Sequence, residues 1–424
     1  MQTRLSAAFL ETPAGREADA ILRKCVHCGF CTATCPTYQL LGDELDGPRG
    51  RIYLIKEVLE GAEPSRVTQL HLDRCLTCRA CETTCPSGVA YGRLLDIGRH
   101  KVERAVPRTF RERLFRHVLL AIVPYRRRFA ALVALGRALR GLLPAALRRA
   151  VPPARPAGAW PVPRHERRML VLTGCAQPVT APGINAAAAR VLDRLGISLI
   201  AVDEGCCGAL AHHLSAEERS REQMRHNIDI WWPEIERGAE ALVVTASGCG
   251  AMIRDYGILL RDDPEYAPKA ARVAELMRDI SQVIAQEFAK SGVPQQRTSS
   301  GPPVPSDPPR PPAKSRPRVA FHSPCTLQHG LRIRGVIEQQ LERAGCTLTS
   351  VADGHLCCGS AGSYSLLQPA ISRQLKVNRL AALQADEPDI IATANIGCLL
   401  HLASGTGLPV RHWIEVLAEM SAPD

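Results

Sequence analysis

Apolar residues follow two different patterns along the chain. Between residues 101 and 150 they recur at helical spacing, as in FRERLFRHVLLAIV and RRFAALVALGRALRGLLPAALRRA, which predicts amphipathic helices. After residue 168, short apolar runs such as MLVL and ALVV alternate with helix-like stretches such as AAAARVLDRLGISLIAV. Strands that alternate with helices are typical of an α/β unit with a parallel sheet.

This strand and helix pattern occurs twice. RRMLVLTGC ends at Cys175 and RPRVAFHSPC ends at Cys325, and the helix-like GVIEQQLERAGCTLTSV of the second copy matches the stretch quoted above. Tandem cysteines follow in GCCGA and LCCGSAG, and strand-like runs then end at Cys249 and Cys398. The steps between these cysteines are 31, 1 and 42 residues in one copy and 32, 1 and 40 in the other. We expect two α/β repeats whose cysteines lie at strand ends, where such proteins place their sites.

Two further cysteine runs precede the repeats. CVHCGFCTATCP at residues 25–36 and CLTCRACETTCP at residues 75–86 share one spacing. The pattern C-x2-C-x2-C-x3-C-P is that of bacterial ferredoxins, in which the fourth cysteine ligates the other cluster. It predicts two [4Fe–4S] clusters, one held by Cys25, Cys28, Cys31 and Cys85 and the other by Cys35, Cys75, Cys78 and Cys81. Structural zinc fits poorly, because its sites pair short hooks across a longer gap and need only four ligands.

Residues near these two runs have expected roles of their own. Pro36 and Pro86 are expected to turn the chain away and to prevent a continuing helix. His27 and His71 are expected at the surface or behind the ligands, since eight cysteines suffice. Arg49 and Arg51 have two open alternatives: they compensate the negative charge of the clusters and raise their potentials, or they lie in solvent.

The repeats contribute eight cysteines whose role stays open among three alternatives. They form one or two additional metal centres, redox-active thiols, or buried structural cysteines; the residues are Cys175, Cys206, Cys207, Cys249, Cys325, Cys357, Cys358 and Cys398. Gly208 and Gly359 follow the tandem pairs and predict tight turns. Cys346 lacks a counterpart and is expected to be an ordinary buried thiol. Four histidines near these cysteines are candidate donors to sulfur or to a substrate oxygen: His212, His213, His322 and His355.

The predicted fold class is therefore a multidomain combination of α+β and α/β parts. A mainly helical, dicluster ferredoxin-like N-terminal module precedes two repeated α/β cysteine-rich (CCG) domains. The expected boundaries are 1–100 for the double [4Fe–4S] domain, 101–167 for a basic helical segment with a Pro-rich linker, 168–290 for the first cysteine-rich domain, 291–317 for a Pro/Ser-rich linker, and 318–424 for the second cysteine-rich domain.

The composition indicates the class of protein and the cellular compartment that we expect. The chain has 424 residues, 46% of them hydrophobic and 22% charged, which is ordinary for a globular protein. Its N-terminus lacks a secretory signal, so we expect a cytoplasmic chain with reduced thiols, in which clustered cysteines bind metal rather than form disulfides. No apolar stretch reaches the roughly 18–20 residues of a membrane-spanning helix.

Charge is concentrated in one segment. Residues 101–168 contain 17 Lys and Arg against 3 Asp and Glu, so that their net charge of +14 exceeds the +11 of the whole chain. Arg-rich amphipathic helices suit an anionic membrane surface, and docking onto an acidic partner is the alternative. Nucleic-acid binding is disfavoured, because the segment has few aromatic residues and no accompanying recognition module.

Together these motifs resemble a known family. KCVHCGFCTATCPTYQLLGDELDGPRGRIYLIK, HLDRCLTCRACETTCPSG, NIDIWWPEIERGAEALVVTASGCGAM and ATANIGCLLHLAS are similar to the iron–sulfur subunits that accompany flavin dehydrogenases, and to glycolate oxidase iron–sulfur subunits in particular. Related families are the heterodisulfide-reductase-like proteins, the small subunit of anaerobic glycerol-3-phosphate dehydrogenase and lactate-utilisation proteins. The similarity covers essentially the full chain apart from the two proline-rich connectors.

The resemblance implies an oxidoreductase complex with divided roles. A partner subunit with FAD would oxidise glycolate to glyoxylate, and also D-lactate, at a hydroxy-acid site outside this chain. This chain would carry electrons through its clusters to a quinone or another acceptor. A further subunit and peripheral contact with the cytoplasmic face of the inner membrane are also implied. The alternatives are a lactate or glycerol-3-phosphate dehydrogenase subunit, or a heterodisulfide-reductase-like catalytic subunit.

One departure from the family pattern weakens the last alternative. Members with a non-cubane cluster close each repeat with C-x-x-C. Here the same positions read CGAM at 249–252 and CLLH at 398–401, so each repeat lacks its fifth cysteine. Four cysteines per repeat remain enough for a cubane.

Overall fold

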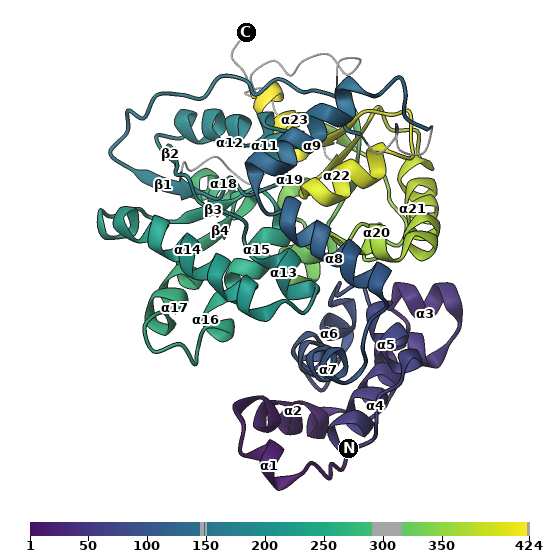
Figure 1. The fold of residues 1–424 in the computed structure, drawn as a ribbon. Helices are drawn as coiled ribbons and strands as arrows, with labels where there is room; N and C mark the ends of the chain where they lie inside the picture. The colour runs from purple at the N-terminus through teal and green to yellow at the C-terminus, as the bar shows by residue number, and fades with distance from the viewer. Residues whose placement is uncertain (145–147, 149–150, 291–315, 422–424) are drawn as a thin grey trace.

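The computed structural model describes residues 1–144, 148, 151–290 and 316–421. The expected linker 291–317 therefore lies outside the described residues except for its last two positions. Figure 1 shows a helical N-terminal module that projects from a larger body built of two sheets and their helices. The module carries the two cysteine runs, and the body carries the two repeats.

The N-terminal module is built from short helices around one small core. Leu22, Ile55, Leu72 and Leu94 are buried at its centre. Local capping defines its helix starts, as where Thr12 Oγ1 accepts a hydrogen bond from the Gly15 amide at 3.0 Å. The elements are α1 (Ala7–Leu10), α2 (Pro13–Lys24), η1 (Phe30–Thr32), α3 (Pro36–Leu41), η2 (Glu44–Asp46), α4 (Pro48–Leu59), α5 (Arg66–Asp73), α6 (Ala80–Thr84) and α7 (Tyr91–Ala105).

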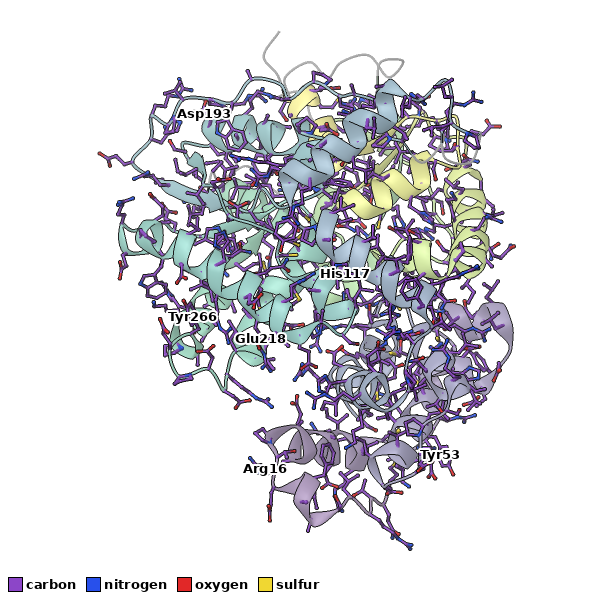
Figure 2. All side chains as sticks on the ribbon, viewed as in Figure 1. Arg16, Tyr53, His117, Asp193, Glu218 and Tyr266 are labelled. Carbon is purple, nitrogen blue, oxygen red and sulfur yellow. The ribbon has the colours of Figure 1, made fainter. Side chains whose placement is uncertain are left out.

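Two amphipathic helices cross from the module onto the body (Figure 1): α8 (Phe110–Ile122) and α9 (Arg126–Ala138). Leu119 and Leu120 of α8 pack against Ala211 and Leu214 of the body. Figure 2 places His117 on this helix at the junction of the two parts. Within the described part of the chain, no helix is long and apolar enough to cross a bilayer.

The first repeat forms a four-stranded parallel sheet in the order β2-β1-β3-β4, with helices between the strands. Its register pairs Leu170 with Ile200 on one side and with Leu242 on the other. The elements are β1 (Arg168–Val171), α11 (Gln177–Thr180), α12 (Gly183–Arg194), β2 (Ser198–Ala201), α13 (Ala209–His213), α14 (Glu217–Glu236), β3 (Leu242–Val244), α15 (Ser247–Arg254), α16 (Tyr256–Leu259), α17 (Ala267–Leu276), β4 (Met277–Asp279) and α18 (Ile280–Lys290).

The second repeat has the equivalent parallel sheet, in the order β6-β5-β7-β8. Its register pairs Val319 with Leu348 and with Ile390. The elements are β5 (Arg318–His322), the π-helical turn η4 (Thr326–Gly330), α19 (Val336–Arg343), β6 (Thr347–Leu348), α20 (Tyr364–Leu367), α21 (Pro369–Gln384), β7 (Ile390–Thr393), α22 (Ile396–Ala403), β8 (Val410–His412) and α23 (Trp413–Met420).

The two repeats share one continuous hydrophobic core. Their backbones join directly, since the Ser247 amide donates to the Ala394 carbonyl at 3.2 Å. A second link runs from the buried ring of His412, whose Nε2 hydrogen-bonds the Thr245 carbonyl oxygen at 2.8 Å. The predicted fold class, a helical N-terminal module followed by two α/β repeats with parallel sheets, is confirmed.

One local expectation was met and another was wrong. No helix continues from the first cysteine run through Pro36, since Cys35 is extended; a new helix, α3, begins at Pro36, because a proline at the first helical position has the required φ and needs no amide donor. The helix-like stretches of the repeats do not remain helical: α12 ends at Arg194 and α19 at Arg343, and each stretch then enters a strand. Gly196 and Gly345, with φ of 77° and 96°, end these helices in the left-handed conformation that favours glycine.

Candidate iron–sulfur sites

Both cysteine runs bend sharply at equivalent positions. His27 and Gly29 of the first run have φ of 55° and 84°, and Thr77 and Arg79 of the second run have φ of 53° and 59°. This left-handed conformation is unfavourable by roughly 1–2 kcal/mol for residues with a side chain, and it concentrates at functional sites. The bends wrap each run around a space instead of letting it continue as a helix or strand.

The first cavity, of about 440 Å³, lies under the first run. Its wall includes Cys25, Cys28 and Cys31 of that run and Cys85 of the second run. These are the four cysteines that the spacing groups for one cluster. Its rim is open, since Cys28 is exposed and the side chains of Val26 and Phe30 are 68% and 62% exposed.

The second cavity, of about 300 Å³, takes the complementary set. Cys35 of the first run and Cys75, Cys78 and Cys81 of the second run line it. Cys81 and Tyr91 line both cavities, so the two spaces adjoin each other. Five cysteines thus line the first cavity and four the second, and sets of four thiols drawn from both sharply bent runs fit [4Fe–4S] clusters.

Polar groups reach the sulfurs of the second cavity. Tyr91 Oη donates to Cys75 Sγ at 3.6 Å, and Thr37 Oγ1 lies 3.3 Å from Cys35 Sγ. The Thr77 amide also donates to Cys75 Sγ at 3.5 Å. Hydrogen bonds to cluster sulfurs change the reduction potential of the cluster. These three groups would therefore affect the potential of a cluster bound in the second cavity.

A buried charge network supports the same cavity. Arg51 is 1% exposed, lines the second cavity, and donates to the His71 carbonyl at 2.7 Å. Its Nη2 also lies 3.3 Å from Asp46, which accepts from Arg74 at 2.7 Å and contacts His71 Nδ1 at 3.0 Å. One carboxylate thus faces two guanidinium groups, and the remaining positive charge suits thiolate-bound clusters. For Arg51 the solvent alternative is wrong; Arg49 is half-exposed and pairs with Glu44.

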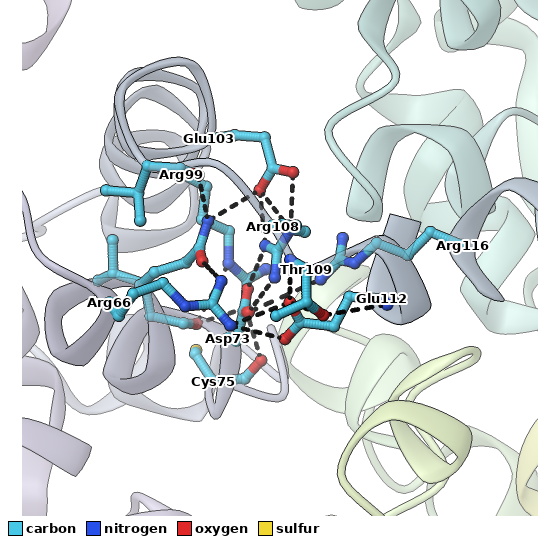
Figure 3. A network of polar contacts seen from close by, with 12 residues as sticks. Arg66, Asp73, Cys75, Arg99, Glu103, Arg108, Thr109, Glu112 and Arg116 are labelled. Carbon is cyan, nitrogen blue, oxygen red and sulfur yellow. Dashed lines mark hydrogen bonds and ion pairs between the residues drawn. The ribbon is translucent and has the colours of Figure 1, made fainter. Parts of the chain in front are cut away.

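A second network, shown in Figure 3, fixes the start of the second run. Arg99 of α7 donates to the carbonyls of Leu72 and Cys75. Arg108 pairs with Asp73 at 2.7 Å, and Arg116 of α8 reaches the same carboxylate at 3.7 Å. Part of the positive charge of the basic segment is therefore used inside the molecule to hold α5, α7 and α8 together.

Burial favours the protonated form of some of the thiols in the cavity walls. It raises the pKa of Cys31 to about 11, and burial together with Cys325 raises the pKa of Cys78 well above its ordinary value. Metal binding requires deprotonated cysteine. Such thiols therefore become thiolates when a metal supplies the compensating charge.

In the first repeat, the four cysteines gather in one buried group. Their thiols contact one another in the order Cys175, Cys206, Cys207, Cys249. Gly208 turns the chain after the tandem pair with φ of 90°, and a Cβ there would meet the Ser220 carbonyl oxygen at 3.2 Å. The predicted tight turn is present.

The second repeat repeats this arrangement and adds contact with the N-terminal module. Cys325 Sγ lies 3.8 Å from Cys357 Sγ, and Cys358 contacts both Cys357 and Cys398. Cys325 and Cys357 share a small apolar cluster with Leu76 and Cys78 of the second run. The thiols of this repeat therefore lie beside the second cavity.

The candidate histidines separate into different roles. His71 is buried against Asp46, and His212 pairs with Asp96 of the module at 3.2 Å rather than with a cysteine. His322 is fully buried with Cys358 and Cys398, and their ligand atoms lie within 4.8 Å of one another. Within the described part of the chain, no hydrogen bond joins His213 or His355 to a sulfur atom, and the His355 carbonyl instead lies 3.0 Å from His329 Nε2. Cys346 lies in the core.

Sequence reasoning missed two residues of the second cavity, Thr37 and Tyr91, and the buried carboxylate of Asp46, which pairs with Arg51 of its wall. The hydroxyls carry no sequence pattern, since Thr37 and Tyr91 reach sulfur only after α3 and α7 are placed. The signal for Asp46 was available in its charge context, because one acid followed by Arg49, Arg51 and Arg74 can satisfy buried arginines.

These sites define an iron–sulfur protein with a ferredoxin-type module and two cysteine-rich domains. The family model described as "4Fe-4S dicluster domain" matches residues 21–89, and that described as "Cysteine-rich domain" matches residues 169–254 and 319–403. Together they cover more than half of the chain. Iron–sulfur cluster binding is thereby supported.

Three individual relatives show which kind of iron–sulfur subunit the chain is similar to. The "Glycolate oxidase iron-sulfur subunit" of Escherichia coli (strain K12) is 52% identical over 99% of both chains. The "Probable glycolate oxidase iron-sulfur subunit" of Bacillus subtilis (strain 168) is 30% identical over 91% of this chain and 89% of the relative. "Lactate utilization protein A" of Shouchella clausii is 24% identical over 57% of this chain and 95% of the relative. The chain belongs to the family of glycolate oxidase iron–sulfur subunits, and the resemblance stated from its motifs is confirmed.

Proposed function

We propose that this chain is the electron-transfer subunit of a glycolate oxidase complex. A partner flavin subunit oxidises glycolate to glyoxylate, and also D-lactate, and this chain passes the electrons towards a quinone or another acceptor. The observation that carries the proposal is the pair of adjoining four-cysteine cavities, each completed by a cysteine of the other run. The 52% identity over the full chain supports the choice of substrate.

The residues of this chain hold and tune the carriers. Cys25, Cys28, Cys31 and Cys85 would bind one [4Fe–4S] cluster, and Cys35, Cys75, Cys78 and Cys81 the other. Each cluster supplies a one-electron carrier, whereas oxidation of glycolate to glyoxylate releases two electrons and two protons. The flavin on the partner subunit converts between these two steps. Arg51, Thr37 and Tyr91 provide charge and hydrogen bonds to the second position.

The most direct test is made on the complex purified anaerobically with its flavin subunit. Iron and sulfide are counted per chain, and low-temperature EPR spectra are recorded before and after glycolate, D-lactate or glycerol 3-phosphate is added. We expect at least eight irons and signals of two interacting reduced clusters with glycolate. Reduction by glycerol 3-phosphate alone would move the chain to that dehydrogenase. Zinc in place of iron would refute the electron-transfer role.

A lactate-specific complex is the second candidate, because two proteins named lactate utilization protein A are 24% identical over 57% and 58% of this chain. It predicts that D-lactate or L-lactate reduces the clusters and glycolate does not. A heterodisulfide-reductase-like activity has less support, since Met252 and His401 stand where the family places the fifth cysteines.

We also propose that α8 and α9 rest on the cytoplasmic face of the inner membrane. Phe110, Leu114, Leu132 and Leu135 of these helices are 71%, 50%, 49% and 55% exposed. Exposed arginines lie among them at positions 111, 113, 127 and 128. Exposed apolar residues beside arginines are the features of a helix that binds anionic lipid.

Vesicle sedimentation tests this placement. The purified complex should bind phosphatidylglycerol vesicles and not phosphatidylcholine vesicles, and 0.5 M salt should release it. Leu132→Glu with Leu135→Glu should abolish binding, while Ile258→Glu, at an exposed apolar position of α16, should not. If the paired variant binds vesicles normally but loses its partner subunit, the face is a protein interface and the membrane proposal is wrong.

A further inference from the structure

The two repeats share one framework around their thiols, which allows their surroundings to be compared position by position. In the first repeat Ser220 Oγ donates to the Gly208 carbonyl at 3.1 Å, and in the second Ser372 Oγ donates to the Gly359 carbonyl at 2.7 Å. These bonds place α14 and α21 in the same register behind the tandem cysteines. The cysteines themselves align the other segments.

Five equivalent positions around the thiols differ in the same direction. The first repeat has apolar, neutral or acidic residues there, and the second has basic residues or histidines. In the first repeat they are Leu172, Glu204, Met224, Asn227 and Met252, and in the second they are His322, His355, Lys376, Arg379 and His401. Lys376 and Arg379 therefore bring two cations to positions of the second repeat that have none in the first.

Arg379 is the centre of this difference. It is 3% exposed, and no carboxylate of the described chain lies within ion-pair distance of it. Its Nη1 donates to the carbonyls of Ala352 and Asp353, and its Nη2 has no hydrogen-bond partner among the described residues. Its electrostatic neighbours are the thiols of Cys358, Cys357 and Cys398 and the carboxyl group of Asp353, which forms no ion pair with it. A buried guanidinium without a carboxylate is costly unless an anion faces it.

His322 adds a second buried group without a partner. Arg379 Nε donates to its Nδ1 at 3.1 Å, and a guanidinium can only donate, so the neutral ring carries its proton on Nε2. That Nε2 has no partner among the described residues, and the ring lies with the sulfurs of Cys358 and Cys398. An N–H group at this place is a hydrogen-bond donor for thiolate sulfur or for a metal-bound group.

In the first repeat, the residue at the position of Arg379 is neutral and needs no anion beside it. Asn227 stands in place of Arg379, and its amide is satisfied by the Cys206 carbonyl and the Gly205 amide. Glu204 accepts from the amides of Thr173 and Gly174 and adds a carboxyl group near the thiols. The described cation beside these thiols is Arg126, which is 34% exposed, donates to the Gly174 carbonyl and already faces the Glu204 carboxyl group at 3.8 Å, so neutral thiols fit this site better than thiolates.

We propose that only the second repeat holds a thiolate-bound metal centre, and that Arg379 and His322 are the positioning residues that make it able to do so. Cys325, Cys357, Cys358 and Cys398 supply the thiolates, Arg379 offsets their charge, and His322 donates a hydrogen bond to sulfur. Because Cys325 and Cys357 pack with Cys78, this centre adjoins the second cavity and extends the row of sites into the body.

The proposal is independent of the substrate of the complex, because its test reads metal content without any substrate. The full chain is purified anaerobically with its partner, in two matched variants: Cys357→Ser with Cys358→Ser, and Cys206→Ser with Cys207→Ser. Iron, sulfide and zinc per chain are measured together with EPR spectra. We expect the second-repeat variant to lose one whole centre and the first-repeat variant to lose none. Loss of iron with sulfide would identify a cluster, and loss of zinc a single ion.

Equal loss in both variants, loss in neither, or loss in the first-repeat variant alone would overturn the proposal. Two milder variants keep it testable if the cysteine pairs fail to fold. Arg379→Asn introduces the residue of the first repeat, and Arg373→Asn changes an exposed arginine of the same helix. With unchanged circular dichroism, Arg379→Asn should at least halve the occupancy of the third centre and Arg373→Asn should leave it intact. Full occupancy in Arg379→Asn would refute the role of the buried arginine.

Discussion

The two cavities of the N-terminal module have the same cysteine pattern and opposite surroundings. The first opens to solvent beside Val26, Cys28 and Phe30. The second lies between the buried network of Arg51 and the apolar contact of Leu76 with the second repeat. The same cysteine motif therefore forms two cavities that differ in their exposure to solvent and in the residues around them. The open cavity suits exchange with another protein, and the enclosed one suits transfer within the chain.

The largest expected effect comes from replacing, with alanine, the cysteine that each cavity takes from the other run. Cys85→Ala should remove the cluster of the first cavity and Cys35→Ala that of the second, about four irons in each case. Iron and sulfide counts measure the loss, and alkylation followed by mass spectrometry shows which thiols become reactive. Cys28 should react in the first variant and Cys78 in the second. The reverse pattern would show that each run binds its own cluster.

Breaking the ion pairs beside the two cavities should lower the free energy of unfolding by different amounts. Asp46→Ala leaves Arg51 and Arg74 without their carboxylate, and breaking a buried pair costs about 3–5 kcal/mol. Glu44→Ala breaks the half-exposed pair with Arg49 beside the first cavity, which should cost less than about 1 kcal/mol. Denaturant unfolding of the anaerobically purified chain gives both values. Similar midpoints for the two variants would contradict the difference in burial.

Replacing Tyr91 should change the reduction potential of the second cluster only. Tyr91→Phe removes the hydrogen bond to Cys75 Sγ while keeping the ring that lines both cavities. A bond of about 1 kcal/mol corresponds to roughly 40 mV for one electron, so the second cluster should become more negative by about that amount. An EPR-monitored redox titration resolves the two. A shift of the first cluster instead would assign the hydroxyl to the other site.

The smallest effect is expected at the open rim. Phe30→Ala should slow electron exchange with the flavin subunit by less than about tenfold, since loss of one rim contact typically costs 1 kcal/mol or less. Iron content and potentials should not change. Tyr53→Ala is the matched control, because Tyr53 of α4 is 49% exposed away from the cavity walls. Stopped-flow reduction compares the two, and an equal effect would remove Phe30 from the contact surface.

The sequence predicted the chemistry of this protein better than its local geometry. Cysteine spacing predicted two groups of four ligands, and the cysteines of each predicted group line one cavity together, although Cys81 lines both cavities. The strands β6 and β8 of two and three residues are too short for periodicity to reveal. Arg51 could not be placed, since its burial depends on Asp46 and on a carbonyl twenty residues away.

The same limit applies to the repeats. Their cysteine steps revealed the duplication, but the contrast between Arg379 and Asn227 becomes visible only when Ser372 and Ser220 align the two helices. Asn227 begins one of the stretches that carry the family resemblance and Arg379 lies outside all of them, but neither is a cysteine or next to one, and each lies within a helix. Differences between duplicated units are thus found by superposing their hydrogen bonds rather than by reading either unit alone.

Each cavity takes its fourth thiol from a run fifty residues away, and this arrangement has a consequence for biosynthesis. A nascent chain that ends before residue 75 contains three thiols of the first cavity but only Cys35 of the second. The second set is complete once Cys81 has been synthesised, and the first set only once Cys85 follows. Loading with metal then fastens both runs to each other at once, closing the intervening loop and restricting the unfolded chain. Maturation of this module is therefore expected to be all-or-none.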